Sequence, residues 1–385
     1  MKKIFSSTRL PAGKGGLMLL ILLSLASTGC ERFLDDLADH FHKNNKGHKY
    51  LKGFEQVNLV GSTADYDPAR IDANLVNGWG IAFSPGGTAW VNATNTGLSF
   101  LFNAEGVPPR SPVAVPSPGA PTGGLPTGIV FNGTGGFLLS NGQPARFIFV
   151  GVDGILSGWN GGTGNLAERI ADKSATSAYT GLAIATDAGA TFLYAANFRT
   201  GKIDVYDSEF EEVTDKPFVD PALPAGYAPF NIQAIGSNLY VLYALVGANG
   251  RDVPGVGNGY VSIFNSNGQF IRRFASRGHL NAPWGIALAP VSFFTQDDNG
   301  AGDDSSPAPE PAILIGNFGD GRIHAYATDG RLLGPLQAKG KPIVIEGLWA
   351  ITFPPTTATT VDQDRLYFAA GPDAEEQGLF GYIIK

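Results

Sequence analysis

One stretch of the sequence decides the fold: Leu193-Tyr-Ala-Ala-Asn-Phe-Arg-Thr-Gly-Lys-Ile-Asp-Val-Tyr206. It holds two strand-like runs joined by a short segment that ends in Gly201. Polar and apolar residues alternate in the second run, which is the pattern of a β-strand with one covered face. Glycine adopts a positive φ at little cost, so Gly201 suits the turn between two antiparallel strands. The stretch therefore predicts a β-hairpin packed on one side.

The same pattern recurs six times, aligned on one glycine. The six segments are Gly97-Leu-Ser-Phe-Leu-Phe102, Gly154-Ile-Leu-Ser-Gly-Trp159, Gly201-Lys-Ile-Asp-Val-Tyr206, Gly259-Tyr-Val-Ser-Ile-Phe264, Gly321-Arg-Ile-His-Ala-Tyr326 and Gly378-Leu-Phe-Gly-Tyr-Ile383. The glycines lie 47 to 62 residues apart, and five of the six segments carry an aromatic residue five positions later. A repeat of this length indicates an array of similar supersecondary units.

A second aligned column precedes each of these hairpins. It reads Trp79-Gly-Ile-Ala-Phe83, Thr127-Gly-Ile-Val-Phe131, Thr180-Gly-Leu-Ala-Ile184, Phe230-Asn-Ile-Gln-Ala234, Trp284-Gly-Ile-Ala-Leu288 and Trp349-Ala-Ile-Thr-Phe353. Small and branched residues of this kind suit a crowded innermost strand. With a fourth strand after the third in several repeats, the chain has four strands per unit and six units. The prediction is an all-β fold, a six-bladed β-propeller over residues 54–385.

The two ends of the propeller are predicted to pair with each other. The last repeat stops at Lys385 without a fourth strand, whereas an unassigned strand-like run, Phe54–Val60, precedes the first repeat. We expect this N-terminal run to complete the last blade. Closure of this kind removes two exposed sheet edges.

Composition agrees with many short strands and turns. The 385 residues include 52 Gly and 26 Pro, and only 16% are charged, whereas average proteins have about 12% Gly plus Pro and about 25% charged residues. Ample aromatic residues and low charge exclude a largely disordered chain. The net charge of -7 argues against a nucleic-acid partner, which requires a basic surface.

Residues 1–30 are interpreted as an export signal that ends in a lipid-attachment site. Basic residues precede the ten-residue apolar run Leu17–Ala26, which is too short to span a bilayer of about 30 Å. The run is followed by Ser-Thr-Gly-Cys30, and Cys30 is the only cysteine. This ending resembles a bacterial lipobox, so we expect an exported, membrane-anchored bacterial lipoprotein whose only membrane contact is this lipid. Ordinary signal cleavage is the alternative. Residues 31–53 are expected to be a tether, with a short helix as one possibility.

Several motifs resemble NHL-type propellers, and more closely an uncharacterised bacterial family of exported six-bladed propeller proteins. They are Asn74–Gly80, Tyr194–Arg199, Leu223–Ile232, Leu280–Gly285, Gly316–Gly321 and Gly347–Trp349. The resemblance covers about residues 54 to 384. It implies a six-bladed propeller and export, and it supplies no catalytic residues.

Topology predicts which loops share a face. If the four strands run outward from the axis, the connection into each inner strand and the connection between the second and third strands lie on one face, called here the entry face. We expect a ligand-binding surface there. Its candidate residues are Asn77, Trp79, Asp153, Asn197, Arg199, Asn231, Trp284, Asn317, Asp320, Glu346 and Trp349. The alternative for each residue is structural, with tryptophans packing near the axis and asparagines satisfying turn backbone.

Aromatic residues, amides and a few charges around a depression favour a polar small molecule, a glycan or a protein as partner. The rival hypothesis is a Ca²⁺-dependent lactonase-like hydrolase, in which Glu346, Asn231, Asn197 and Asn317 supply the oxygen ligands that a hard cation needs. Otherwise we expect no cofactor, and a monomer. The acidic insertion with Asp297, Asp298, Asp303 and Asp304 lacks EF-hand spacing and is interpreted as a solvated loop.

Substitution Cys30→Ala tests the lipid anchor. We expect incorporation of radiolabelled fatty acid into the protein to disappear, because the acylated thiol is gone. Labelling that persists in Cys30→Ala would contradict the anchor.

Overall fold

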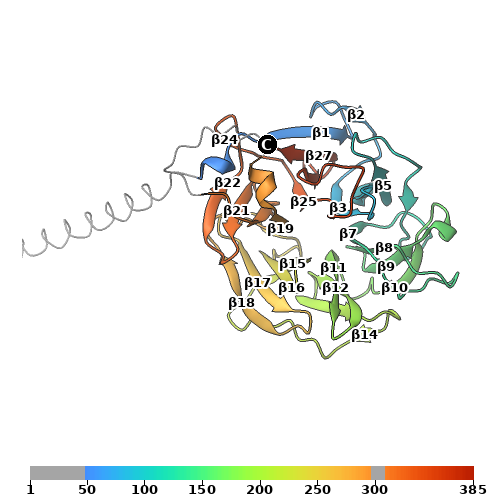
Figure 1. Cartoon of the computed structure of the whole chain (residues 1–385). Coiled ribbons are helices and arrows are strands. Elements are labelled where there is room, and N and C mark those ends of the chain that lie inside the picture. The colour runs from blue at the N-terminus through green and yellow to red at the C-terminus, as the bar shows by residue number, and fades with distance from the viewer. Residues whose placement is uncertain (1–47, 296–307) are drawn as a thin grey trace, which may run out of the picture. The chain divides into compact units, whose positions relative to one another are not determined.

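Six β-sheets surround a central axis like the blades of a propeller (Figure 1). The computed structural model describes residues 48–295 and 308–385, and residues Tyr50–Lys385 form one unit. Among these residues the regular structure is β-strand plus short 3-10 turns. The predicted all-β, six-bladed propeller is therefore confirmed.

Each blade is described from its inner strand outward. Blade 1 contains β3 (Gly78–Phe83), β4 (Ala89–Ala93), β5 (Leu98–Phe102) and β6 (Val113–Ala114), and blade 2 contains β7 (Pro126–Phe131), β8 (Phe147–Gly151), β9 (Ile155–Trp159) and β10 (Glu168–Asp172). Blade 3 contains β11 (Tyr179–Asp187), β12 (Ala190–Asn197), β13 (Lys202–Tyr206) and β14 (Glu212–Val213), and blade 4 contains β15 (Tyr227–Ile235), β16 (Asn238–Leu245), β17 (Gly259–Asn265) and β18 (Phe270–Ser276).

The last two blades follow the same plan. Blade 5 contains β19 (Pro283–Ala289), β20 (Ala312–Asn317), β21 (Ile323–Ala327) and β22 (Leu332–Pro335). Blade 6 contains β25 (Leu348–Thr352), β26 (Leu366–Ala370), β27 (Leu379–Ile384) and β1 (Glu55–Gly61), with β2 (Arg70–Ile71) added parallel to β1. The 3-10 turn η1 (Lys49–Leu51) precedes β1. The hairpin of β23 (Gln337–Ala338) and β24 (Lys341–Pro342) and the 3-10 turns η2 (Thr94–Thr96), η3 (Gly161–Thr163) and η4 (Val291–Phe294) lie between blades or strands.

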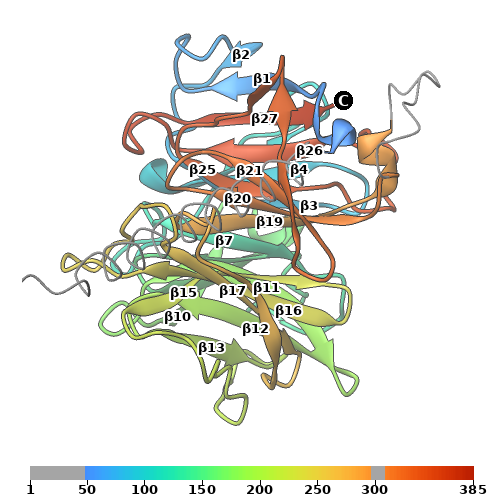
Figure 2. The same ribbon diagram turned by 90° about the vertical axis from the view of Figure 1, so that its left-hand side faces the viewer.

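The N-terminal strand closes the ring as predicted. β1 pairs antiparallel with β27, with Val57 opposite Tyr382 and Glu55 opposite Ile384. Figure 2 shows β1 beside β27 at the outer side of this blade. The register shifts between Asn58 and Val60. Blade 6 is thus built from both ends of the propeller, and backbone hydrogen bonds hold the ring shut.

The glycines of the inner-strand column let neighbouring blades approach closely. A Cβ at Gly80 would lie 2.2 Å from the Thr127 carbonyl oxygen of blade 2, and one at Gly285 would lie 2.7 Å from the Trp349 carbonyl oxygen of blade 6. Such distances are far below van der Waals contact. Only glycine fits these positions, which explains the recurring small residue in the column.

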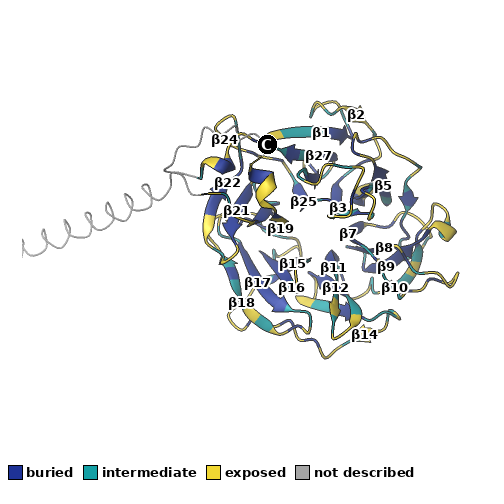
Figure 3. Ribbon diagram, viewed as in Figure 1, coloured by how far each residue is buried: buried dark blue, intermediate teal, exposed yellow. Residues whose placement is uncertain are grey.

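The core lies between the blades, and Figure 3 shows buried strands all around the ring. At the junction of blades 1 and 2, the Trp90 and Phe147 rings stack with their centroids 3.9 Å apart. In blade 6, Val60 of β1 is fully buried and belongs to the same apolar cluster as Phe102 and Phe380. The closing strand therefore contributes packing as well as backbone hydrogen bonds.

Two of the predicted segments lie outside the described residues. The first is the predicted signal with Cys30 together with the tether up to residue 47, and the second is the acidic insertion Asp297–Asp304. Within the described residues, no helix is long and apolar enough to cross a membrane.

Substitution Val60→Ala tests the closing strand. Removing two buried methyl groups from the core should lower the free energy of unfolding by about 1–3 kcal/mol, measured by urea denaturation. The control is Val256→Ala, because Val256 is 79% exposed. Equal urea midpoints for Val60→Ala and the wild-type protein would show that β1 does not belong to the cooperative unit.

Candidate functional site

Three tryptophans meet on the propeller axis. Trp79, Trp284 and Trp349 come from the inner strands β3, β19 and β25. The ring centroids of Trp79 and Trp349 are 3.5 Å apart and nearly parallel, whereas Trp284 packs edge-on against Trp349 at 5.9 Å. Phe318 stacks on the other side of Trp349 at 3.9 Å. The predicted tryptophans are thus brought together, as a buried stack that we call the aromatic plug.

Hydrogen bonds between blades fix the plug. Nε1 of Trp349 donates to Oδ1 of Asn77 at 2.9 Å, which joins blade 6 to blade 1. Nε1 of Trp284 donates to the Thr180 carbonyl oxygen of blade 3, and Nδ2 of Asn231 donates to the Trp284 carbonyl oxygen. Two of the three indoles therefore have a fixed orientation.

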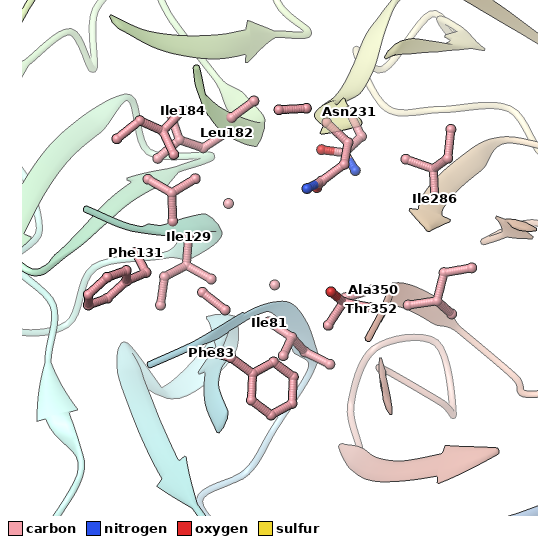
Figure 4. A pocket seen from close by; sticks show the side chains of 18 of the residues that line it. Ile81, Phe83, Ile129, Phe131, Leu182, Ile184, Asn231, Ile286, Ala350 and Thr352 are labelled. Carbon is pink, nitrogen blue, oxygen red and sulfur yellow. The ribbon is translucent and has the colours of Figure 1, made fainter. Parts of the chain in front are cut away.

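Beyond the plug lies a cavity of about 440 Å³, called the channel, lined by the second halves of the inner strands. Figure 4 shows that most side chains in its wall are apolar, with Asn231 and Thr352 among the polar ones. The labelled wall residues are Ile81, Phe83, Ile129, Phe131, Leu182, Ile184, Asn231, Ile286, Ala350 and Thr352. Trp284 also lines the channel, whereas Trp79 and Trp349 line a different cavity.

That second cavity, the axial hollow, lies on the entry face and has a volume of about 270 Å³. Aromatic side chains of Trp79, Phe198, Phe230 and Trp349 form part of its wall. Its polar and charged lining residues are Asn77, Thr94, Asn95, Thr180, Arg251, Asp252 and Glu375. A concave aromatic surface with a few polar groups is the usual composition of a small-molecule site.

An ion pair crosses the mouth of the axial hollow. Arg251, in the β16–β17 loop of blade 4, lies 2.6 Å from Oε1 of Glu375, in the β26–β27 loop of blade 6. Nδ2 of Asn95 also donates to the Glu375 carbonyl oxygen at 2.8 Å. Both charged residues, and Asp252 with them, also line a neighbouring cavity of about 430 Å³, the outer hollow. The pair therefore stands between the two hollows.

The loop that presents Glu375 has an unusual backbone. Asp373, Ala374 and Glu375 all have positive φ, at 54°, 53° and 72°. Three consecutive residues with side chains in the left-handed region are uncommon, and each costs of order 1 kcal/mol or more. Strain of this kind persists only where surrounding contacts hold it, and here these include the Arg251 and Asn95 contacts.

Two buried polar atoms of the axial hollow find no hydrogen-bond partner among the described residues. They are Oδ2 of Asp252 and Nε1 of Trp79. Burial raises the pKa of Asp252 to about 6, and the nearby Arg251 guanidinium opposes that rise. Buried polar groups are normally hydrogen-bonded, so two lining residues of one hollow that each carry an unpaired buried atom make this hollow a candidate ligand site.

Several predicted site residues instead satisfy their own turns. Asn197 accepts from the Ala178 and Thr200 backbone N–H groups and donates to Asp204 and Ser177. Asn317 accepts from the Asn281 N–H and donates to the His279 carbonyl oxygen and to Asp320. The contacts of both asparagines therefore agree with the alternative stated above, in which they satisfy the backbone of their own turns.

The charged candidates outside the axial hollow also contact backbone. Asp153 accepts from the Leu125 N–H, and burial raises its pKa. Arg199 is exposed and donates to the Ser174 carbonyl oxygen, at the long distance of 3.4 Å. Glu346 lines the outer hollow and accepts from the Asp373 N–H.

The four proposed Ca²⁺ ligands lie in different places. Asn231 lines the channel, Glu346 lines the outer hollow, and the Asn197 and Asn317 amides belong to turns of blades 3 and 5. No group of three or more His, Cys, Asp or Glu side chains that could hold a metal ion occurs within residues 48–295 and 308–385.

Three charged residues of the axial hollow are absent from the candidate site residues named from the sequence: Arg251, Asp252 and Glu375. All three lie in loops between the repeated columns, so alignment of the repeats does not single them out. The available signal was local. Arg251-Asp252 interrupts a loop otherwise made of Gly, Ala, Val, Asn and Pro, and such an isolated charged pair on the entry face is a candidate for recognition.

No protein-family model matches the chain. It is 34% identical over 344 residues to uncharacterized protein R648 of Acanthamoeba polyphaga mimivirus, covering 86% of this chain and 80% of that protein. It is 33% identical over 346 residues to uncharacterized protein L690 of the same virus, covering 86% of each. The chain belongs to the family of these two proteins. Because both relatives are viral, they give no support to the expected bacterial and exported character of the family.

Solved structures agree with the fold. A protein of unknown function from Bacteroides thetaiotaomicron is 11% identical with a TM-score of 0.50, covering 86% of this chain and 76% of that chain. Virginiamycin B lyase from Staphylococcus aureus is 14% identical with a TM-score of 0.42, covering 86% and 99% of the two chains. The first similarity concerns the fold alone, and the second is too low to carry an argument about this family's chemistry.

Substitution Asp252→Asn tests the burial of this carboxyl group. Because its pKa is raised from 3.8 to about 6, the folded state binds more protons than the unfolded state between these values, and stability falls as pH rises through them. Relative to Asp252→Asn, the wild-type protein should lose up to about 3 kcal/mol between about pH 4 and pH 7.5, measured by urea denaturation. The exposed Asp215→Asn is the control. A pH-independent difference between wild-type and Asp252→Asn would contradict the raised pKa.

Proposed function

We propose that the propeller binds a small polar ligand in the axial hollow. The observation that carries this proposal is that Asp252 and Trp79, which both line one aromatic-walled hollow, each carry a buried polar atom without a hydrogen-bond partner, Oδ2 and Nε1. Each atom leaves a desolvated polar group unpaired, which costs about 1–3 kcal/mol. A ligand that supplies a donor to the carboxylate and an acceptor to the indole recovers this free energy.

The shape of the hollow favours a small molecule over a protein partner. A volume of about 270 Å³ is close to the lower limit of drug-sized ligand pockets, about 300 Å³. Its wall is held by rings already stacked on one another and by the hydrogen bond between Asn77 and Trp349. A wall that is fixed before binding loses little conformational entropy when a ligand arrives.

Binding without chemistry is the function we propose, rather than calcium-dependent hydrolysis. The favoured residues, Trp79, Asp252 and Glu375, line one hollow, whereas the four calcium candidates lie in separate places. We further propose that the protein is exported and lipid-anchored through Cys30. The support for this second proposal is the apolar run Leu17–Ala26 followed by the lone cysteine.

Substitution Ala178→Leu tests the binding site. Ala178 is partly buried and lines the hollow, and it contributes only its own backbone atoms to its hydrogen bonds, its N–H donating to Oδ1 of Asn197 and its carbonyl oxygen accepting from the Phe198 N–H. The larger side chain should fill part of the hollow. Saturation-transfer NMR with glycerol, D-glucose, N-acetyl-D-glucosamine and choline should show at least one binder, weakened roughly tenfold or more in the variant, equivalent to about 1.4 kcal/mol.

The matched control is Ala190→Leu. Ala190 is exposed and begins β12 at the turn after β11, on the face opposite the axial hollow. This variant should bind like the wild-type protein. Absence of binding by every probe, or equal binding by Ala178→Leu and wild-type protein, would overturn the proposed function.

A further inference from the structure

We infer that the ligand of the axial hollow is an organic cation, an ammonium group that carries a nearby hydroxyl or carbonyl oxygen. This inference rests on the proposed function and names the class of ligand. It is argued from the charge balance of the hollow, from its aromatic wall and from the position of its one unpaired donor.

The charged side chains that line the hollow leave one negative charge without a partner. They are Arg251, Asp252 and Glu375. Arg251 lies 2.6 Å from Glu375, so these two charges balance each other. Oδ2 of Asp252 is buried and has no hydrogen-bond partner among the described residues. The hollow therefore has a surplus carboxylate when Asp252 is ionised.

A largely buried carboxylate whose neighbouring guanidinium is already paired with another carboxylate favours a cation as its ligand. Burial raises the pKa of Asp252 to about 6 and Glu375 adds to the rise, whereas the backbone N–H of Asp252 and the Arg251 guanidinium oppose it. The group is thus mainly ionised above neutral pH, in an environment that disfavours the charge. A positive ligand placed beside it removes this penalty, because paired buried charges are far less costly than isolated ones.

The aromatic wall selects an organic cation over a metal ion. Trp79, Phe198, Phe230 and Trp349 contribute to the lining, and aromatic surfaces bind alkylammonium groups through cation–π attraction and methyl packing. Calcium needs six to eight oxygen ligands. Of the oxygen-bearing side chains in this hollow, Glu375 is already paired with Arg251 and Oδ1 of Asn77 already accepts from Trp349, so the hollow does not supply such a set.

The unpaired indole adds a second requirement. Trp79 is 4% exposed, and its Nε1–H finds no acceptor among the described residues although the residue lines the hollow. The indole group is a donor only, so the ligand must bring an oxygen or another acceptor. An amino alcohol satisfies the carboxylate and the indole together.

Choline and 3,3-dimethyl-1-butanol give a matched test, because they share shape and hydroxyl group and differ in charge. Titration of the full chain followed by saturation-transfer NMR at about pH 7.5 should show choline binding roughly tenfold or more tightly. Asp252→Asn should remove this preference, and Asp215→Asn should retain it. Lowering the pH to about 5 should weaken choline binding to the wild-type protein, because Asp252 becomes protonated.

The outcomes separate this inference from the proposed function. Equal or tighter binding of the uncharged alcohol, or a choline preference that survives in Asp252→Asn, overturns the cation while leaving the hollow as a binding site. The same holds if glucose or N-acetyl-D-glucosamine binds and choline does not. Failure of every probe overturns both.

Discussion

Close approach of the inner strands to a common axis is the constraint on which the rest of the propeller depends. At Gly80 and Gly285 a single Cβ would overlap the carbonyl oxygen of the next blade. Because the ring is narrow, inner-strand side chains from different blades reach one another. Trp79 and Trp349, from adjacent blades, stack at 3.5 Å in this crowded centre. The glycines of the column therefore permit the close approach of the inner strands around the aromatic plug.

The plug in turn divides the axis into two spaces with different chemistry. On one side lies the channel, whose wall carries no charged side chain among the described residues, and on the other the axial hollow, whose lining includes Arg251, Asp252 and Glu375. The indole hydrogen bonds to Asn77 and Thr180 tie blades 6 and 5 to blades 1 and 3. The residues that stabilise the centre of the ring thus also shape the wall of the candidate site, which couples recognition to the integrity of the fold.

The fold could be predicted from the sequence because each blade repeats the same pattern of alternation and glycine. The pairing of Val57 with Tyr382 followed from counting strands, since one blade lacked a strand and one strand lacked a blade. The site was harder, because its decisive contacts join loops that do not repeat. Asn197 and Asn317 are ordinary turn residues, whereas Arg251 and Glu375 meet across blades only in three dimensions. Aligned positions of the repeats predict the local geometry of strands and turns, and they do not predict which loop residues of different blades contact one another.

The pairing of Glu55 with Ile384 brings the two ends of the propeller to adjacent positions on one sheet. The contacts between blades in the closed ring therefore do not depend on which blade contains the chain ends. A circular permutant that joined these ends with a short linker and opened a different exposed loop would contain the same six sheets. Only the seam would move, to whichever blade then combined strands from both termini.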